Sequence, residues 1–404
     1  MKTHLTTPSR LIAYFAKWIA IASIIALLAG SASAFFLISL EWVTHTRLTN
    51  PLLLLGLPIG GAFVGWCYHR FGQSVEAGNN LLIDEIHDPK QIIPLRMAPL
   101  VLMGTLVSHL FGASVGREGT AVQMGGALAD QLTHYFRLNQ ADRKLILMSG
   151  ISAGFASVFG TPIAGAIFGL EVWMLGRLRH DALFPCLVSA FLANLVTGLW
   201  GVHHTHYQIG LIPDFSISTW LWVLFLGAAA GLCGKGFATL THFIGSRAKK
   251  AIPSPVLRPF IGGAVLAALF LCFPLSAYSG LGIPVIQSAF HQTLNAYDWL
   301  AKLLLTAFSI GTGFKGGEVT PLFYMGATLG NAIAQLSHLP LGLMAGLGFI
   351  AVFSGAANTP LACTLMAIEL FGGQIALPAL FVATVSYLFS GSATIYKAQR
   401  SESP

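Results

Sequence analysis

Long apolar runs separated by short polar connectors make up most of this chain. A continuous apolar helix of about 20 residues spans a bilayer. Some of the runs reach that length, and others are shorter or are interrupted by Gly and Pro. Interrupted segments at membrane depth are tolerated where they line a cavity or pack against protein, and they point to a transport site. The pattern therefore predicts an all-α, polytopic membrane protein. The runs cover residues 15–41, 51–69, 94–115, 121–136, 145–175, 184–202, 217–244, 257–276, 298–313, 321–338, 341–371 and 375–392.

The first run has some features of a cleavable signal peptide. Lys2, Arg10 and Lys17 precede it, and the small-residue sequence SASA occupies positions 31–34. However, the apolar run continues past these small residues, and its full length is sufficient to cross a bilayer. We therefore predict a retained first membrane helix over residues 15–41.

Composition supports the membrane assignment. Apolar residues make up 55% of the 404 residues and charged residues only 9%, whereas a soluble domain carries about 25% charged residues. The mean hydropathy is +0.72. The net charge of +7 does not indicate nucleic-acid binding, because the basic residues lie in connectors and flank the termini. That distribution is typical of cytoplasmic loops and predicts that both termini are cytoplasmic. The connector residues are Arg247, Lys249, Lys250 and Arg258, and the C-terminal ones are Lys397 and Arg400.

The cysteines and histidines do not form a recognisable metal or catalytic motif. The five cysteines lie in apolar context without paired spacing, and we predict that they are small buried side chains. They are Cys67, Cys186, Cys233, Cys272 and Cys363. The sequence His203-His204-Thr205-His206 lies in a polar connector, where we predict solvated residues. No HExxH, CxxC or nucleophile-elbow motif is present. We therefore expect neither an enzyme nor a bound metal or cofactor.

The chain contains an internal repeat. Residues 161–171 read TPIAGAIFGLE and residues 359–369 read TPLACTLMAIE, which aligns their Thr-Pro and Glu positions at an offset of 359 − 161 = 198. Within a few residues, the same offset pairs GREGT at 116–120 with GGEVT at 316–320. Two similar halves around a shared site are predicted. Sequence alone leaves open whether the halves are parallel or inverted.

The motif Gly116-Arg117-Glu118-Gly119 places two ionisable residues between apolar runs. Charge at membrane depth indicates a functional site. Glycines let the backbone turn tightly, and a helix that begins here offers unpaired N–H groups to an anion. A glutamate at this position could occupy such an anion site and could also carry a proton. The alternative is a glutamate that only caps its own helix.

Three further elements offer hydrogen-bond donors to an anion. In Gly316-Gly317-Glu318-Val319-Thr320-Pro321, the proline suits a first helical turn, and the N–H groups of Val319 and Thr320 and the Thr320 hydroxyl would point out of the helix end. Asn79, in the helix start at 76–80, has an amide that could donate to an anion or could cap the helix. Tyr396, beyond the last apolar run, could donate its hydroxyl or anchor the chain at the membrane surface.

In their order along roughly residues 15–396, these elements resemble the CLC family of chloride channels and proton-coupled anion antiporters. The resemblance implies a CLC fold with two inverted-topology halves, within residues 15–202 and 217–396 of a single transmembrane domain. We expect no C-terminal regulatory domain, because the chain stops within ten residues of Tyr396. It implies a homodimer with one pore per subunit. It makes Glu118 the gating glutamate and Tyr396 the inner-gate tyrosine. The anion-binding residues that it implies are Gly78, Asn79, Gly116, Arg117, Gly119, Val319, Thr320 and Tyr396.

Four positions differ from the chloride-transporting members. Asn79 stands at the chloride-coordinating serine, Thr120 replaces the proline of GREGP, and Val319 replaces a phenylalanine. Val172 stands at the inner proton glutamate. These departures resemble the fluoride-transporting CLC branch, in which Glu318 could take over part of the proton route.

The resemblance therefore implies a fluoride/proton antiporter in the inner (plasma) membrane that exports fluoride in exchange for protons. The alternatives are a chloride/proton antiporter or a passive anion channel of the same fold. Fluoride is small and strongly hydrated, so a selective site must supply strong donors. The Asn79 amide and the hydroxyls of Thr320 and Tyr396 are the candidate donors.

Overall fold

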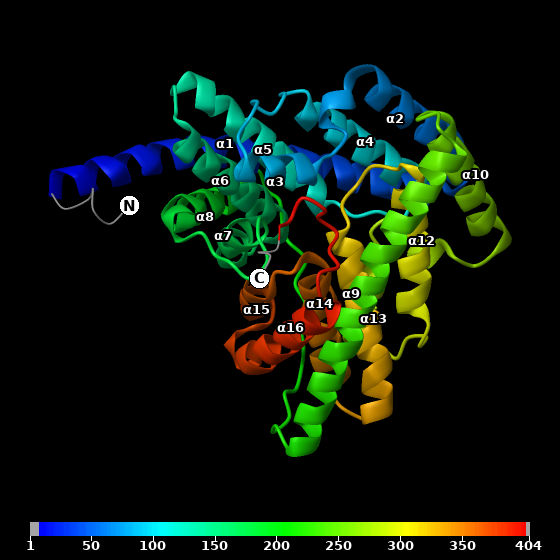
Figure 1. The fold of residues 1–404 in the computed structure, drawn as a ribbon. Coiled ribbons are helices and arrows are strands. Elements are labelled where there is room, and N and C mark those ends of the chain that lie inside the picture. Colours follow the sequence, from blue (N-terminus) through cyan, green and yellow to red (C-terminus); the bar gives the residue numbers. More distant parts are fainter. Residues whose placement is uncertain (1–7, 401–404) are drawn as a thin grey trace.

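The computed structural model describes residues 8–400, which form sixteen α-helices arranged as two helical groups (Figure 1). Lys2, one of the basic residues flanking the first apolar run, lies outside the described residues. In the first half the helices are α1 (Pro8–Thr49), α2 (Leu57–Phe71), α3 (Asn79–His87), α4 (Met97–Phe111), α5 (Glu118–Tyr135), α6 (Gln140–Phe159), α7 (Pro162–Glu171) and α8 (Leu183–Leu199). In the second half they are α9 (Ile217–Ala251), α10 (Leu257–Cys272), α11 (Ile283–Ala289), α12 (Asp298–Thr312), α13 (Val319–Ser337), α14 (Leu341–Ala357), α15 (Pro360–Phe371) and α16 (Ala376–Ser390).

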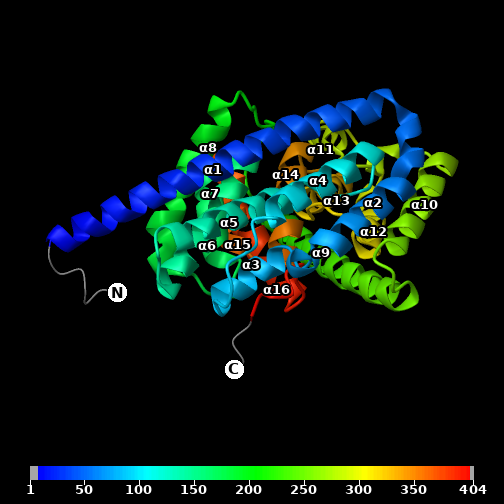
Figure 2. The ribbon, with the colours of Figure 1, turned by 90° about the horizontal axis from the view of Figure 1, so that it is seen from above.

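The order and lengths of the helices repeat between the halves. Helices α5 and α13 have 18 and 19 residues, and each follows a glycine-rich crossing loop. A long helix packs along each half: α1 lies against α4, α5, α6 and α8, and α9 lies against α12, α14 and α16 (Figure 2). The predicted membrane helix over 15–41 is therefore the middle of a longer helix of 42 residues.

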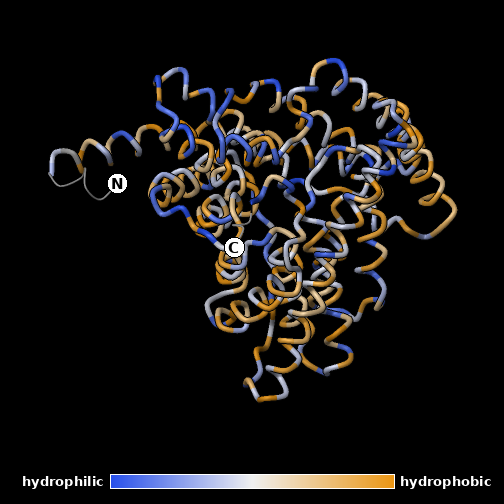
Figure 3. The backbone as a smooth tube through the Cα atoms, in the orientation of Figure 1, coloured by the Kyte–Doolittle hydropathy of each residue, from blue (hydrophilic) through white to orange (hydrophobic). Residues whose placement is uncertain are grey.

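Within residues 8–400, five helical stretches are long and apolar enough to cross a bilayer. The remaining apolar helices are shorter, as the Gly and Pro interruptions predict. Figure 3 shows hydrophobic residues along most helices and hydrophilic ones mainly at the connectors. Many large apolar side chains are exposed, for example Ile59, Leu199 and Ile217, and such a surface suits lipid rather than water. The prediction for the cysteines is wrong for Cys272, which ends α10 and is exposed, whereas the other four are buried.

Glycine lets equivalent helix pairs approach closely in both halves. A Cβ on Gly125 of α5 would lie 2.4 Å from the Gly150 carbonyl oxygen of α6. A Cβ on Gly326 of α13 would lie 2.1 Å from the Gly348 carbonyl oxygen of α14. Small residues at helix crossings are a typical solution in membranes, where packing rather than water exclusion holds helices together.

Two glutamates join the halves at α7 and α15. The Glu369 carboxylate accepts hydrogen bonds from the N–H groups of Ile163 (2.9 Å) and Ala164 (2.8 Å) at the start of α7. The Glu171 carboxylate accepts from Leu361 (3.1 Å) and Ala362 (2.9 Å) at the start of α15. Each helix is thus capped by a glutamate near the end of the other, so the two run antiparallel. An antiparallel relation between equivalent helices is what an inverted repeat requires.

Candidate functional site

The two glycine-rich motifs cross at the centre of the molecule. The N–H of Gly116 donates to the Gly317 carbonyl at 2.6 Å, and the N–H of Gly317 donates back to Gly116 at 2.7 Å. A Cβ on Gly116 would lie 2.7 Å from Pro321 Cδ, and one on Gly317 would lie 2.8 Å from the Gly119 nitrogen. Only glycine fits this crossing without displacing the backbone. The two halves therefore meet through the motifs that the repeat had paired.

Glu118 begins α5 and is completely buried. Its carboxylate accepts hydrogen bonds from the backbone N–H of Thr320 at 2.9 Å and from the Thr320 hydroxyl. The Arg117 backbone N–H (3.2 Å) and Nε (3.3 Å) donate to the same carboxylate. The carboxylate does not merely cap its own helix, because two of its donors come from the start of α13.

This geometry gives Glu118 the position of a bound anion. The start of α13 presents an N–H group, a hydroxyl and the positive end of the helix dipole. The expectation that the Thr320 N–H points out of the helix end is thus confirmed. Val319 is also brought to this crossing and is almost fully buried, at 2% exposure. A carboxylate that occupies an anion site and can bind a proton could alternate with a mobile anion.

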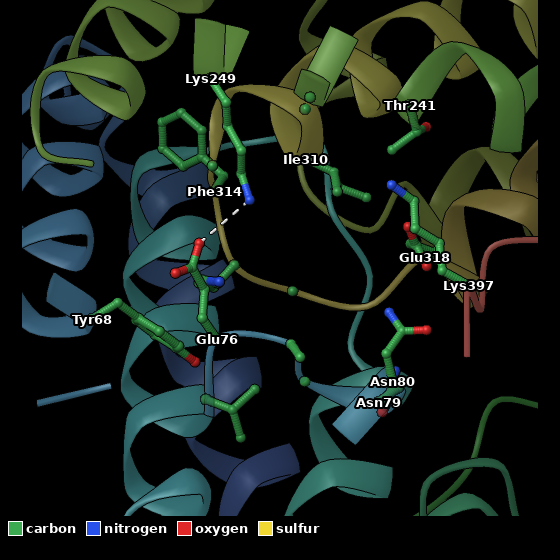
Figure 4. Close-up of a pocket in the computed structure, with 18 of the residues that line it drawn as sticks. Tyr68, Glu76, Asn79, Asn80, Thr241, Lys249, Ile310, Phe314, Glu318 and Lys397 are labelled. Carbon is green, nitrogen blue, oxygen red and sulfur yellow. Dashed lines mark ion pairs between the residues drawn. The ribbon is translucent and has the colours of Figure 1, made fainter. Parts of the chain in front are cut away.

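Glu318 lies one residue before α13 and faces a cavity of about 810 Å³ (Figure 4). Its carboxylate makes no hydrogen bond to any other residue in the part of the chain that the structure describes. Neither Glu118 nor Thr320 lines this cavity. The two glutamates therefore differ in their surroundings: the Glu118 carboxylate is held by hydrogen bonds, whereas the Glu318 carboxylate faces the large cavity.

Basic side chains outnumber acidic ones around this cavity. Four lysine and arginine residues line it, against two glutamates, Glu76 and Glu318. Glu76 faces Lys249 at 3.7 Å, as the dashed line in Figure 4 marks. An excess of positive charge in a concave, low-dielectric wall concentrates anions. The cavity thus suits an anion that approaches the crossing. The basic residues are Lys249, Arg258, Lys315 and Lys397.

Asn79 begins α3 at the wall of this cavity, after Gly78, whose φ of +59° favours glycine. The Asn79 side chain makes no capping hydrogen bond, and its buried Oδ1 has no partner among the described residues. Its Nδ2 lies 3.1 Å from the position that a Cβ on Gly119 would take. The amide therefore lies beside the start of α5, close to the crossing, and it does not serve as a helix cap.

Tyr396 also lines this cavity, with only 4% of its surface exposed. Its backbone N–H donates to Thr394 Oγ1 at 3.1 Å, which helps to fix the segment after α16. A void of about 10 Å³ lies between Tyr396, Asn79 and Val172. Tyr396 is therefore a buried part of the cavity wall and does not lie exposed at the surface, and Val172 presents an apolar side chain beside it.

A second small cavity lies against Glu118, and sequence reasoning missed half of its wall. This cavity, of about 20 Å³, is lined by Arg117, Glu118 and Thr320 from the crossing and by His204, Thr205 and Tyr207 from the connector between the halves. The prediction of solvated connector histidines holds for His203 and His206, which are exposed, and is wrong for His204. The signal was the histidine-rich stretch itself, but sequence could not place it over Glu118.

In the described part of the chain, no group of three or more His, Cys, Asp or Glu residues could hold a metal ion. The chemistry of the crossing is instead that of hydrogen-bond donors and carboxylates. These groups can bind an anion and a proton in turn.

Comparison with known proteins places this geometry in a family. The model of the family described as voltage gated chloride channel matches residues 60–391. A chloride/fluoride channel protein from Pseudomonas syringae pv. tomato is 58% identical, over 96% of this chain and 88% of its own length. The H(+)/Cl(-) exchange transporter ClcA from Vibrio vulnificus is 28% identical, over 87% of this chain and 81% of its own.

Solved structures show the same architecture. A crystal structure of a CLC-type fluoride/proton antiporter superposes with a TM-score of 0.93 at 36% identity, covering 98% of this chain and 100% of its own. A slow cyanobacterial Cl⁻/H⁺ antiporter shares the fold with a TM-score of 0.82 at 21% identity, covering 94% of this chain and 96% of its own. The expected all-α CLC fold is thereby confirmed.

Proposed function

The chain belongs to the voltage gated chloride channel family, and on that premise we propose that it exchanges fluoride for protons, exporting fluoride from the cytoplasm. One observation carries the proposal: the Glu118 carboxylate occupies an anion position at the start of α13, held by Thr320. One position that accepts either a carboxylate or a mobile anion is the minimum that exchange requires.

The competition for this position links the two ions. When Glu118 is charged, it holds the donors of Thr320 and blocks an anion. When it takes a proton, it loses the charge that a helix start favours, and an anion can replace it. The proton is thus carried by the group that the anion displaces. A passive channel would need a pathway that stays open, whereas Glu118 here closes the crossing.

Fluoride is favoured over chloride by the donors near the crossing. The Asn79 amide, the Thr320 hydroxyl and the Tyr396 hydroxyl can replace the hydration shell of a small anion. Fluoride also appears in the names of the Pseudomonas syringae protein and of the antiporter with the matching crystal structure. The first of those names describes a channel and the second an antiporter, so proton coupling is the property to measure.

Glu318 is the candidate for the proton route on the other side of the crossing. It faces the large cavity, while Val172, where chloride antiporters carry an inner glutamate, is apolar and buried. A proton that leaves Glu118 therefore has Glu318 as the carboxylate next to the crossing.

Membership of this family also supports a proposal for the orientation and oligomeric state of the protein in the membrane. The large cavity, with its basic wall, faces the cytoplasm, and both termini lie on that side of the inner (plasma) membrane. Two copies form a homodimer with one pathway each, and lipid covers the remaining apolar surface. Exposed apolar residues on the equivalent helices α8 and α16 support a contact between the helices of the two copies. They include Phe191 and Leu195 on α8 and Leu377 and Phe381 on α16. Residues 15–202 and 217–396 act as the halves of one transport domain, which is not an enzyme.

Reconstitution in liposomes tests the function. Fluoride efflux, chloride efflux and proton uptake are recorded together for wild type and for Glu118→Gln. Fluoride flux with proton uptake in wild type, and loss of that uptake in the variant, is expected. Comparable chloride flux would return the chain to the chloride/proton alternative. Fluoride flux that an imposed pH gradient cannot drive would make it a channel.

A further inference from the structure

Three cationic side chains from three different elements line the large cavity. Lys249 lies in the last turn of α9, Arg258 is the second residue of α10, and Lys315 lies in the link between α12 and α13. Lys249 and Arg258 both act electrostatically on the Lys315 ammonium. We call these three residues the basic cluster. Their convergence costs free energy, because like charges at close range repel each other.

Arg258 has no protein partner for its charge. Only 8% of its surface is exposed, yet its guanidinium makes no hydrogen bond or ion pair with any residue between positions 8 and 400. A buried charge that lacks a partner is destabilising. The side chain lines the cavity, so its N–H donors are free for a ligand that enters there.

Lys315 is held in place without the use of its hydrogen-bond donors. Its Nζ lies 4.1 Å from the centroid of the Tyr68 ring, which is a cation–π contact. A Cβ on Gly104 would lie 3.0 Å from the Lys315 Cβ, so the base of the side chain is packed against α4. The ammonium forms no hydrogen bond within the described part of the chain. Packing therefore fixes this side chain and leaves its donors to the cavity.

One carboxylate, that of Glu76, lies against the basic cluster. It faces Lys249 at 3.7 Å (Figure 4) and also acts on Lys315. Both partners of the Glu76–Lys249 pair are exposed, and exposed pairs are weak. Three cations against one carboxylate leave two positive charges. A fluoride ion would balance only one of them, whereas a phosphate group carries about −1.5 to −2 charges at pH 7.

We propose that the basic cluster binds a phosphate group, and that its occupancy slows the exchange of fluoride for protons. The arginine fork and the lysine ammonium groups are the donors that phosphate oxygens prefer. The cavity of about 810 Å³ has the size of a small-molecule site, about 300–1,000 Å³. A bound phosphate neutralises the wall that concentrates fluoride. The effect on transport rests on the proposed function, whereas the binding rests on the basic cluster alone.

Binding of inorganic phosphate to the purified protein tests the site. Titration calorimetry with sodium phosphate near neutral pH is expected to show a binding event that Arg258→Gln or Lys315→Gln weakens roughly tenfold, the loss of about one hydrogen bond to a charged group. Glu76→Gln removes the competing carboxylate and should tighten binding roughly threefold. Lys250→Met is the matched control, since Lys250 is the exposed neighbour of Lys249 and does not line the cavity. Sodium nitrate, with a single charge, should bind far more weakly.

The source of the phosphate and its effect on transport need two further measurements. Phosphatidic acid carries the same phosphate on a lipid. Inorganic phosphate that binds equally in nanodiscs with and without this lipid indicates a soluble occupant, whereas loss of binding in its presence indicates a lipid headgroup. In liposomes, phosphate should slow fluoride efflux, and the concentration that halves each protein's own rate should rise roughly tenfold in Arg258→Gln.

The absence of a phosphate binding event in the wild type would overturn the site, and so would equal weakening in Lys250→Met or equal binding of nitrate. If Arg258→Gln does not elute as a folded protein, Lys315→Gln and Glu76→Gln decide, because they change the affinity in opposite directions. Phosphate that binds and leaves fluoride efflux unchanged would overturn the effect on transport. Wild-type liposomes that move no fluoride refute the proposed exchange, whereas the calorimetric result does not depend on it.

Discussion

Glu118 and Glu318 hold equivalent places in the two repeats, and their surroundings differ sharply. Glu118 is the first residue of α5, is fully buried and binds donors from the opposite half. Glu318 lies one residue before α13 and opens onto the large cavity. The repeat thus places two carboxylates at one crossing, and because only Glu118 is fully buried, the two can serve different functions. One can compete with an anion, while the other can exchange protons with water.

Other positions of the repeat keep their equivalence. Asp130 of α5 accepts the N–H of Ile93 at 2.8 Å, and Asn331 of α13 accepts the N–H of Leu294 at 3.1 Å, so each holds the segment before a helix of its own half. In the first half this site is charged, because Arg143 bonds Asp130. Glu171 and Glu369 cap each other's helices in the same way. The repeat therefore keeps these structural roles in both halves, although the charge differs between Asp130 and Asn331.

The largest effect is expected when each of the two glutamates is replaced by its neutral amide, glutamine. Glu118→Gln should reduce proton movement coupled to fluoride roughly a hundredfold, the scale of a lost proton-transfer group. Glu318→Gln should slow proton movement less and leave fluoride binding at the crossing intact. Parallel fluoride and pH recordings on liposomes measure both. Glu76→Gln, an exposed cavity glutamate, is the control. Equal losses in the two variants would erase the distinction between the carboxylates.

The capping pair should respond alike in both halves. In Glu171→Gln or Glu369→Gln, the amide NH₂ faces a backbone N–H, so one hydrogen bond to a charged group is lost, with a destabilisation of about 2 kcal/mol. Thermal unfolding in detergent should show similar drops for the two variants. Glu41→Gln, on the exposed face of α1, should leave the unfolding temperature unchanged. A large drop for only one of the pair would contradict the reciprocal arrangement.

Substitutions at Thr320 test its hydroxyl donor separately from its backbone N–H donor. Thr320→Val removes the hydroxyl and keeps the N–H and the shape, so the apparent affinity for fluoride should fall roughly tenfold. Thr320→Ser retains the donor and should behave as wild type. The concentration dependence of fluoride efflux measures this. If valine and serine give the same affinity, the hydroxyl has no part in the anion site.

The smallest effect is expected at Asn79. Asn79→Ser replaces an amide donor by a shorter hydroxyl, which should lower the preference for fluoride over chloride by roughly fivefold. Paired fluoride and chloride fluxes from the same vesicles give the ratio. Asn80→Ser is the neighbouring control, since Asn80 accepts the Ala398 N–H at 2.9 Å and supports the chain near Tyr396. An unchanged ratio in Asn79→Ser would remove Asn79 from the selectivity determinants.

The sequence predicted most of the helices and the residues of the crossing, because period, length and ionisable residues in apolar runs are local signals. Contacts between distant segments were not predictable. Glu118 meets Thr320 across 202 positions, and His204 lines the same small cavity as Glu118 although they are distant in the chain. The aligned Glu171 and Glu369 were visible in the repeat. Their reciprocal capping depends on an antiparallel crossing that spacing alone does not reveal.

The contacts between the halves also govern how the protein is made. The N–H of Ile163 gains its partner only after Glu369, 206 positions further along the chain, has been synthesised. Glu118 likewise lacks its donor Thr320 until 202 more residues have been added. At about 5–20 residues per second, a ribosome needs roughly 10–40 s to supply these partners. During that time the first half sits in the membrane with an incomplete anion site. A nascent chain therefore has no finished pathway, so synthesis of the transporter does not open a leak for ions in the membrane that it enters.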